Sequence, residues 1–183
     1  MGPARAPRCS HAAVTLLGTR RCLVENQSLE ASFRIWELTR PLWMTHEAKR
    51  YLRLFEVDPD AVPARLSQGQ RSAVDAAFAL ASHSPVLLLD EVHLGMDAVV
   101  RRRFWDTLLQ MYSYERPTIV IASHEVGEIE NLVEDVVVLG RGEGGNRVLA
   151  HGSADELRQA ATPPGAPLAD LTDVLEHMSR RKP

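Results

Sequence analysis

Two adjacent carboxylates, Asp90 and Glu91, follow an uninterrupted run of aliphatic residues from Val86 to Leu89. Such a run is typical of a strand in a parallel sheet that is covered on both faces, so the acids would stand at its carboxyl end. Mg²⁺ prefers one or two carboxylates together with substrate phosphates, and a second acid can act as a base toward attacking water. The pair therefore indicates phosphoryl-transfer chemistry. The alternative is two solvated acids that merely end a strand.

A small polar run, Leu66-Ser67-Gln68-Gly69-Gln70, precedes a helix predicted over residues 71–82. The first turn of a helix presents free N–H groups and a partial positive charge, and both favour phosphate. A glycine in that turn lets the backbone approach a ligand closely. The alternative is that Ser67 caps the helix and has no other role.

A histidine, His124, comes directly after Ser123 and the strand predicted over residues 118–122. Ligands of parallel sheets bind beyond the carboxyl ends of the strands. His124 would therefore lie at the same edge as the two acids, where it could contact a terminal phosphate or a water. A structural histidine is the alternative.

The elements that must position these residues alternate between strand and helix from residue 86 to residue 139. This order predicts an α/β fold with a mostly parallel sheet and helices packed on it. The predicted strands are 14–17, 86–89, 118–122, 136–139 and 147–150, and a hairpin turn at 142–146 joins the last two. The predicted helices are 45–55, 71–82, 98–112 and 125–133. A further helix begins at a capping box at 153–156, and a final amphipathic helix covers 168–178.

Composition supports a soluble globular chain. Of 183 residues, 45% are hydrophobic and 25% are charged, which argues against intrinsic disorder. The net charge of -3 gives no electrostatic footprint for nucleic acid. The longest uncharged stretch, residues 76–89, is shorter than the ~20 apolar residues of a membrane span. Two cysteines, Cys9 and Cys22, are too few for a disulfide scaffold and favour a reducing compartment.

In this order and at this spacing, the motifs resemble those of the ATP-binding cassette (ABC) ATPases, over roughly residues 23–157. Residues 66–70 resemble the signature loop, with Gln68 where the second of two glycines usually stands. Residues 86–90 resemble the Walker B strand and residues 94–97 the D-loop. Residues 21–29 resemble a Q-loop stretch.

The resemblance implies a partial P-loop NTPase-like (ABC ATPase) domain, with a short helical segment before the signature loop, and it implies ATP and Mg²⁺ as cofactors. It implies one ATP site with Mg²⁺ at Asp90, aided by Gln27, and catalysis by Glu91 and the switch histidine His124. The opposite site would be served by Leu66, Ser67, Gln68, Gly69, Gln70 and Asp97.

The resemblance also implies partners and a location. A second nucleotide-binding domain would complete the ATP sites, and a transmembrane permease subunit would hold the chain at the inner, cytoplasmic face of the cell membrane. Nucleic acid and a direct membrane span are not expected. Among the members of the family, the details are most similar to bacterial exporter-type ATPases. Trp36 and Trp43 fall in the stretch that docks on the permease in this family, although core aromatics are the alternative.

The sequence departs from the family upstream of Gln27, where no G-x-x-x-x-G-K-[ST] P-loop motif occurs, and at Val92, where proline is usual. The chain alone is therefore expected to bind ATP poorly. One interpretation is a fragment, or a misplaced start, of a transporter ATPase. A second is a degenerate subunit that donates its signature loop to a partner, and a third is a non-transport ABC ATPase.

The expected organisation has three parts. Residues 1–20 form an irregular segment, residues 21–160 the partial ATPase domain with a helical portion over about 31–65, and residues 161–183 a linker and amphipathic helix. His93 and His151 receive no role from the sequence.

Overall fold

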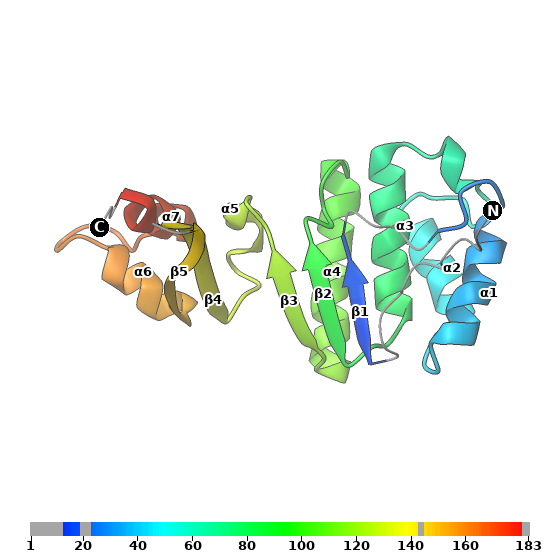
Figure 1. Ribbon diagram of the computed structural model, residues 1–183, viewed down its shortest axis with the longest axis horizontal. Coiled ribbons are helices and arrows are strands. Elements are labelled where there is room, and N and C mark those ends of the chain that lie inside the picture. Colours follow the sequence, from blue (N-terminus) through cyan, green and yellow to red (C-terminus); the bar gives the residue numbers. More distant parts are fainter. Residues whose placement is uncertain (1–12, 19–22, 143–144, 181–183) are drawn as a thin grey trace. The chain divides into compact units, whose positions relative to one another are not determined.

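The computed structural model describes residues 13–18, 23–142 and 145–180, and it divides into two compact units (Figure 1). The first unit is Met1–Ser123 and the second is His124–Pro183. Each is described by itself. Cys9, Cys22 and the start of the predicted Q-loop stretch lie outside the described residues. No helix within the described ranges is long and apolar enough to cross a membrane.

A three-stranded parallel sheet forms the centre of the first unit, in the order β1 (Val14–Leu17), β2 (Val86–Asp90) and β3 (Thr118–Ala122). The register pairs Val14 with Val86 and Val86 with Thr118. β2, which ends at Asp90, is therefore hydrogen-bonded to a neighbouring strand on each side. This confirms the parallel α/β fold expected from the alternation of strands and helices.

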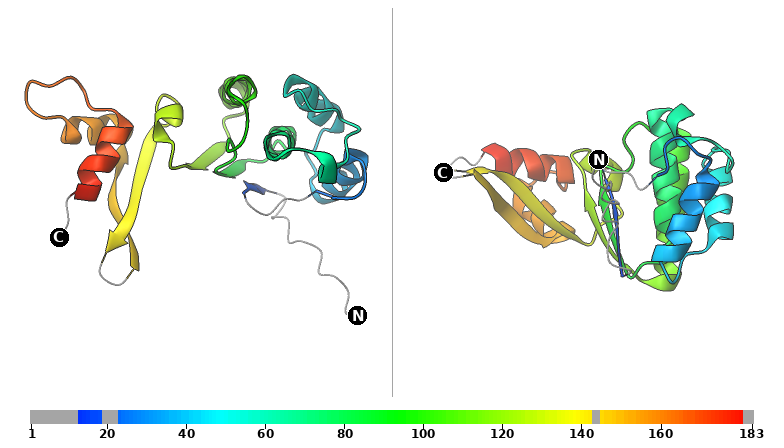
Figure 2. Two further views of the ribbon diagram at one scale, coloured as in Figure 1. Left: turned by 90° about the horizontal axis from the view of Figure 1, so that it is seen from above. Right: turned by 45° about the vertical axis from the view of Figure 1, so that its right-hand side comes forward.

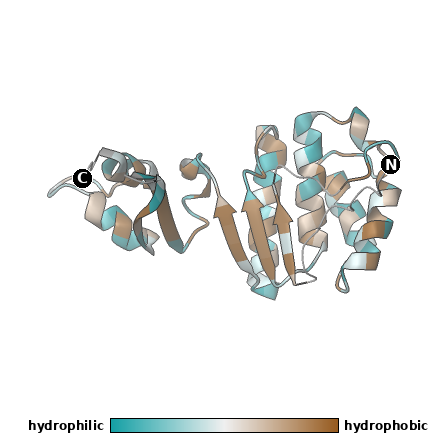
Figure 3. Ribbon diagram, viewed as in Figure 1, coloured by the Kyte–Doolittle hydropathy of each residue, from teal (hydrophilic) through white to brown (hydrophobic). Residues whose placement is uncertain are grey.

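Two long helices, α3 (Gln68–Ala81) and α4 (Ala98–Glu115), cover one face of this sheet (Figure 2). Leu17, Leu87 and Leu89 are buried against them. On the other face, Leu16 and Val120 are 56% and 53% exposed. The strands are mainly apolar (Figure 3), as expected for strands covered on both faces, but the described residues of this unit bury only the side that faces the helices.

An aromatic cluster joins α1 (Leu29–Thr39) and Trp43, which precedes α2 (Thr45–Leu54), to α3. Trp43 lies with its ring centroid 5.1 Å from both Trp36 and Phe78, and Phe33 is 5.4 Å from Phe78. Trp36 and Trp43 are 4% and 8% exposed. Of the two roles considered for these tryptophans, the structure therefore shows the core role.

A buried polar network connects β1 to the ends of two helices. Thr15 Oγ1 lies 3.1 Å from Ser82 Oγ and 2.7 Å from Ser84 Oγ, and it accepts a 2.7 Å hydrogen bond from Arg40 Nη1. The Arg40 guanidinium also stacks over the Trp36 ring at 4.3 Å. Burial lowers the pKa of Arg40 from its ordinary value, because desolvation disfavours the charge. The hydrogen bond that the Thr15 hydroxyl accepts offsets part of that penalty.

Replacing Thr15 with valine is expected to lower the free energy of unfolding of the first unit by about 2 kcal/mol, because it removes an acceptor from a buried guanidinium. Urea denaturation followed by tryptophan fluorescence measures this, since all three tryptophans, Trp36, Trp43 and Trp105, lie in this unit. Thr118→Val, at an exposed position of β3, is the matched control. Equal midpoints for the two variants would contradict the role of the network.

His83 links three helices of the first unit through two carboxylates. His83 follows α3, and its Nδ1 lies 2.8 Å from Glu115 Oε1 of α4 while its Nε2 lies 3.0 Å from Glu47 Oε2 of α2. Burial, followed by the neighbouring Glu47, raises the pKa of the Tyr51 hydroxyl. A 3-10 turn, η1 (Pro63–Arg65), then leads into residues 66–70.

The second unit is a hairpin with three helices. Strands β4 (Asp135–Gly142) and β5 (Gly145–Ser153) are antiparallel, and α5 (Val126–Ile129), α6 (Ala154–Ala161) and α7 (Leu171–Arg180) accompany them. Its core is Val138, Ala154, Leu157, Leu171 and Val174.

Several sequence expectations change in detail. The predicted hairpin of the strands at 136–139 and 147–150 is confirmed as β4 and β5, but these two strands form a sheet of their own and do not extend the parallel sheet. The capping box at Ser153 and Glu156 is confirmed. The helix predicted over 125–133 is only four residues long. The final helix begins at Leu171, so Leu168, which was expected on its apolar face, precedes the helix and is 59% exposed.

Candidate functional site

The first acid, Asp90, is the last residue of β2 and is exposed at the carboxyl edge of the sheet. The chain that runs beside it is the end of β1. A Cβ placed on Gly18 would come within 3.3 Å of both Cβ and Oδ2 of Asp90. The absence of a side chain at Gly18 therefore keeps this carboxylate open on that side. An exposed carboxylate at a strand end is the donor that Mg²⁺ prefers, so Asp90 fits the predicted ion.

The second acid, Glu91, has an unusual backbone. Its φ is +50°, in the left-handed region, which costs a non-glycine residue about 1 kcal/mol or more. Its N–H donates to the carbonyl of Ala122 at 3.0 Å, and its Oε2 accepts from Ser123 Oγ at 3.5 Å. The side chain is 27% exposed. The structure thus brings Asp90, Glu91 and Ser123 together at one edge, as the strand pattern predicts.

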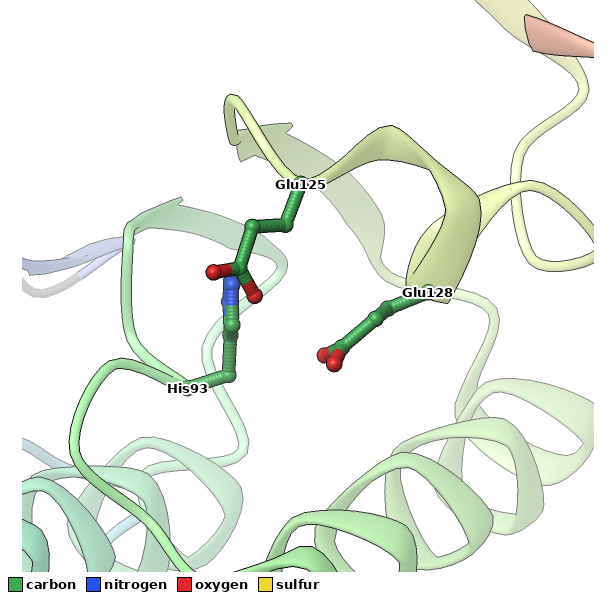
Figure 4. Close-up of side chains that lie close together, drawn as sticks. All are labelled: His93, Glu125 and Glu128. Atoms are coloured by element: carbon green, nitrogen blue, oxygen red, sulfur yellow. The ribbon is translucent and has the colours of Figure 1, made fainter. Parts of the chain in front are cut away.

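A histidine that sequence reasoning left without a role lies next to Glu91. His93, in the loop between β2 and α4 (Figure 4), is fully buried, and its Nε2 is 3.8 Å from Glu91 Oε2. Its ring lies 5.8 Å from that of Trp105. In the sequence, the only sign of this proximity is that His93 stands two residues after Glu91. The two side chains lie close together because the chain turns tightly between them.

The signature-like loop begins α3. Ser67 is the N-cap: its Oγ accepts from the N–H of Gln70 at 3.2 Å, and Gln70 Oε1 accepts from the N–H of Ser67 at 3.0 Å. This capping box extends the helix three residues upstream of the start expected at residue 71. The capping role of Ser67 is therefore confirmed, and it leaves Ser67, Gln68 and Gln70 exposed around the first turn of the helix.

The D-loop-like turn, residues 94–97, packs tightly against this first turn. A Cβ on Gly69 would lie 2.0 Å from the carbonyl oxygen of Gly95, and Gly95 itself has a φ of +79°. Ser72 Oγ donates to the carbonyl of Leu94 at 2.9 Å. The two glycines therefore allow a backbone contact that no larger residue at position 69 could make.

These two turns line one pocket. Asp97 caps α4, accepting from the N–H groups of Val99 and Val100 at 2.9 and 3.0 Å. The pocket, of about 280 Å³, is lined by Phe55, Glu56, Ser67, Gly69, Gln70, Ala73, Gly95, Met96, Asp97 and Val100. Residues predicted separately from the signature loop and the D-loop are thus brought together. The pocket offers helix N-terminal amides, hydroxyl and amide side chains, and a carboxylate that is already engaged as a cap.

Gln27 and His124 are the remaining predicted residues. Gln27 is exposed in a turn before α1, where its N–H is 3.5 Å from the carbonyl of Val24. His124 is exposed and is the first residue of the second unit. The roles of Gln27 and His124 stay predictions.

Comparison with known proteins gives this arrangement a family. No family model matches the chain. The methionine import ATP-binding protein MetN of Chlamydia felis (strain Fe/C-56) is 30% identical over 161 residues, which is 87% of this chain and 44% of that protein. A probable sulfate/thiosulfate import ATP-binding protein, CysA of Chlorella vulgaris, is 34% identical over 113 residues, 61% of this chain and 46% of that protein. The chain is related to the ABC ATP-binding proteins.

A solved ATP-binding subunit of an ABC transporter has the same fold, with a TM-score of 0.75 at 22% identity, over 92% of this chain and 69% of that structure. The expected ABC ATPase fold is thus confirmed. The chain spans less than half the length of these two curated ABC relatives. Both are named as import proteins, and the direction of transport stays a prediction.

Proposed function

We propose that this chain forms the distal part of the ATP-hydrolysing subunit of an ABC membrane transporter. The observation that carries the proposal is the pocket in which the first turn of α3 meets residues 94–97, in the same unit that places Asp90 and Glu91 at the end of β2. The names of its relatives, which are import ATP-binding proteins, support the same activity.

The residues divide between two half-sites. At the end of β2, Asp90 would hold Mg²⁺ with help from Gln27, Glu91 would accept a proton from the attacking water, and His124 would contact the terminal phosphate. Bound Mg²⁺ would neutralise charge on the phosphates. At the start of α3, the amides and Ser67 would bind the phosphates of a second ATP, because a 14-residue helix directs free N–H groups and its positive dipole end there.

Each half-site needs a complement. A second nucleotide-binding domain that carries a P-loop would supply the phosphate cradle opposite Ser67 and Gly69. A solved ATP-binding cassette dimer bound to ADP and phosphate, with a TM-score of 0.63 at 18% identity, has the fold that such a pair would use. A transmembrane permease subunit would place the assembly at the cytoplasmic face of the membrane. Nucleic acid is not an expected partner at a net charge of -3.

The experiment is to purify the tagged chain with the P-loop-bearing ABC ATPase that it binds and to measure ATP hydrolysis with Ser67→Arg. We expect at least a 100-fold loss, because a bulky cation in this pocket displaces the phosphate from its donors. The matched control is Ser113→Arg, at an exposed serine of α4, which should keep the wild-type rate. Unchanged hydrolysis with Ser67→Arg, or no ATPase bound by the wild-type chain, would overturn the proposal.

A second candidate function is a subunit that only donates its signature loop to a partner. The observation in its favour is that this loop and residues 94–97 line one pocket within the first unit. It differs from the first candidate in making Glu91 dispensable, and a substitution there separates the two.

A further inference from the structure

We infer that His93 is a positioning residue for Glu91, whose carboxylate it holds in the orientation that a base toward attacking water requires. The inference rests on the proposed function for the role of Glu91, while the contact between the two side chains can be tested without any turnover.

Both residues belong to one rigid turn after β2. The N–H of Leu94 donates to the carbonyl of Glu91 at 3.1 Å, and the N–H of Met96 donates to the carbonyl of His93 at 3.1 Å. The N–H of Glu91 is tied to Ala122 of β3. The backbone of Glu91 is therefore fixed at both ends, in a left-handed conformation that the surrounding hydrogen bonds maintain. Only the side-chain torsions of Glu91 remain to be set.

The imidazole of His93 is held in place beside the side chain of Glu91. It is fully buried, and its ring packs on Trp105, which is 7% exposed. Val92, just before it, is 5% exposed. An aliphatic or aromatic side chain would satisfy packing alone in this place, whereas a buried polar ring needs polar contacts to offset its desolvation. Glu91 Oε2, 3.8 Å from Nε2, is such a contact.

The distance between His93 Nε2 and Glu91 Oε2 limits the kind of contact that the two side chains can make. At 3.8 Å, Nε2 and Oε2 are too far apart for a direct hydrogen bond, but a small side-chain rotation closes the gap. Ser123 Oγ approaches the same oxygen at 3.5 Å. Two polar groups beside one oxygen restrict the rotation of the carboxylate, and misplacement of a catalytic group by about 1 Å can cost up to ~100-fold in rate.

The first arm of the test is nuclear magnetic resonance of the full chain. Glu91→Gln is expected to shift the ring nitrogen signals of His93 and to leave those of His83 unchanged. Glu115→Gln is the matched control, because it removes the carboxylate 2.8 Å from His83 and should shift only that ring. His93→Phe, which keeps an aromatic ring against Trp105, should broaden or move the side-chain carboxyl signal of Glu91. Unchanged His93 signals in Glu91→Gln would overturn the inference.

The second arm measures ATP hydrolysis in the complex with the P-loop-bearing partner. His93→Phe should lower kcat about tenfold to a hundredfold with KM for ATP nearly unchanged, because the carboxylate is present but wrongly turned. His93→Gln, which restores an N–H donor, should recover part of kcat, and His46→Phe, at an exposed position of α2, should have no effect.

A purely structural His93 predicts a different pattern: equal losses in the Phe and Gln variants that follow their melting temperatures. That result, or an unchanged kcat in His93→Phe, would overturn the inference. If the wild-type complex has no turnover, the proposed function fails, and the signals of His93 and Glu91 alone decide whether His93 orients this carboxylate.

Discussion

Gly69→Ala should lower the free energy of unfolding of the first unit by about 3 kcal/mol, because overpacking against fixed backbone costs this much. Alanine is normally the better helix former by about 1 kcal/mol, so helix propensity alone predicts the opposite sign. The new Cβ would lie 2.0 Å from the carbonyl oxygen of Gly95, well inside van der Waals contact. Either α3 or residues 94–97 must move.

Urea denaturation followed by tryptophan fluorescence measures the loss in Gly69→Ala. Gly127→Ala is the matched control, since the nearest atom to its new Cβ would be Thr172 Oγ1 at 4.0 Å. It should be neutral or slightly stabilising when unfolding is followed by circular dichroism. A Gly69→Ala protein as stable as the wild type would show that residues 66–70 are not held against residues 94–97 in solution.

The second large effect is expected from Glu91→Gln. In the complex with a P-loop-bearing partner, this change should lower ATP hydrolysis by 10²- to 10⁴-fold, roughly the contribution of a general base, and should leave ATP binding intact. The amide keeps the shape of the side chain and its contact with Ser123 but cannot take the proton. Hydrolysis and nucleotide binding are measured on the same preparation, by phosphate release and by equilibrium titration.

Glu37→Gln, at an exposed position of α1 where the carboxylate bonds Thr45 Oγ1, is the matched control for Glu91→Gln. Its rate should equal that of the wild type. If Glu91→Gln also hydrolyses ATP at the wild-type rate while Ser67→Arg does not, the chain acts only as a donor of its signature loop. That outcome would select the second candidate function over the first.

Local hydrophobic patterns in the sequence predict much of the fold. The aliphatic run before Asp90 and the one at residues 118–122 were predicted as neighbouring buried strands, and they pair in parallel with Asp90 opposite Ala122. Patterns of this kind succeed because strand formation and burial depend on the same side chains. The strand over residues 14–17 was also found, although its sequence is short.

Other parts of the structure have no local signature. The contact of Gly69 with Gly95 joins two turns that are distant in the sequence, and a glycine does not reveal which backbone will approach it. The proximity of His93 to Glu91 depends on a turn whose left-handed φ at Glu91 contradicts its ordinary preference. Helix α1 was expected only as part of a broad helical portion, because its aromatic residues pack on Trp43 and on Phe78 of α3.

The strand order also governs how the first unit can form. Strands β2 and β3 pair residues about 30 positions apart, whereas β1 pairs with β2 across about 70 positions. The conformational entropy lost on closing the longer loop costs about 0.7 kcal/mol more. We expect this closure to follow the packing of α1, α2 and α3, since these helices lie within the loop. Long-range parallel pairing is slow. Docking of β1, and with it the arrival of Gly18 beside Asp90, is thus expected to be the last step in the folding of this unit, so that the edge of the sheet at Asp90 forms after its core.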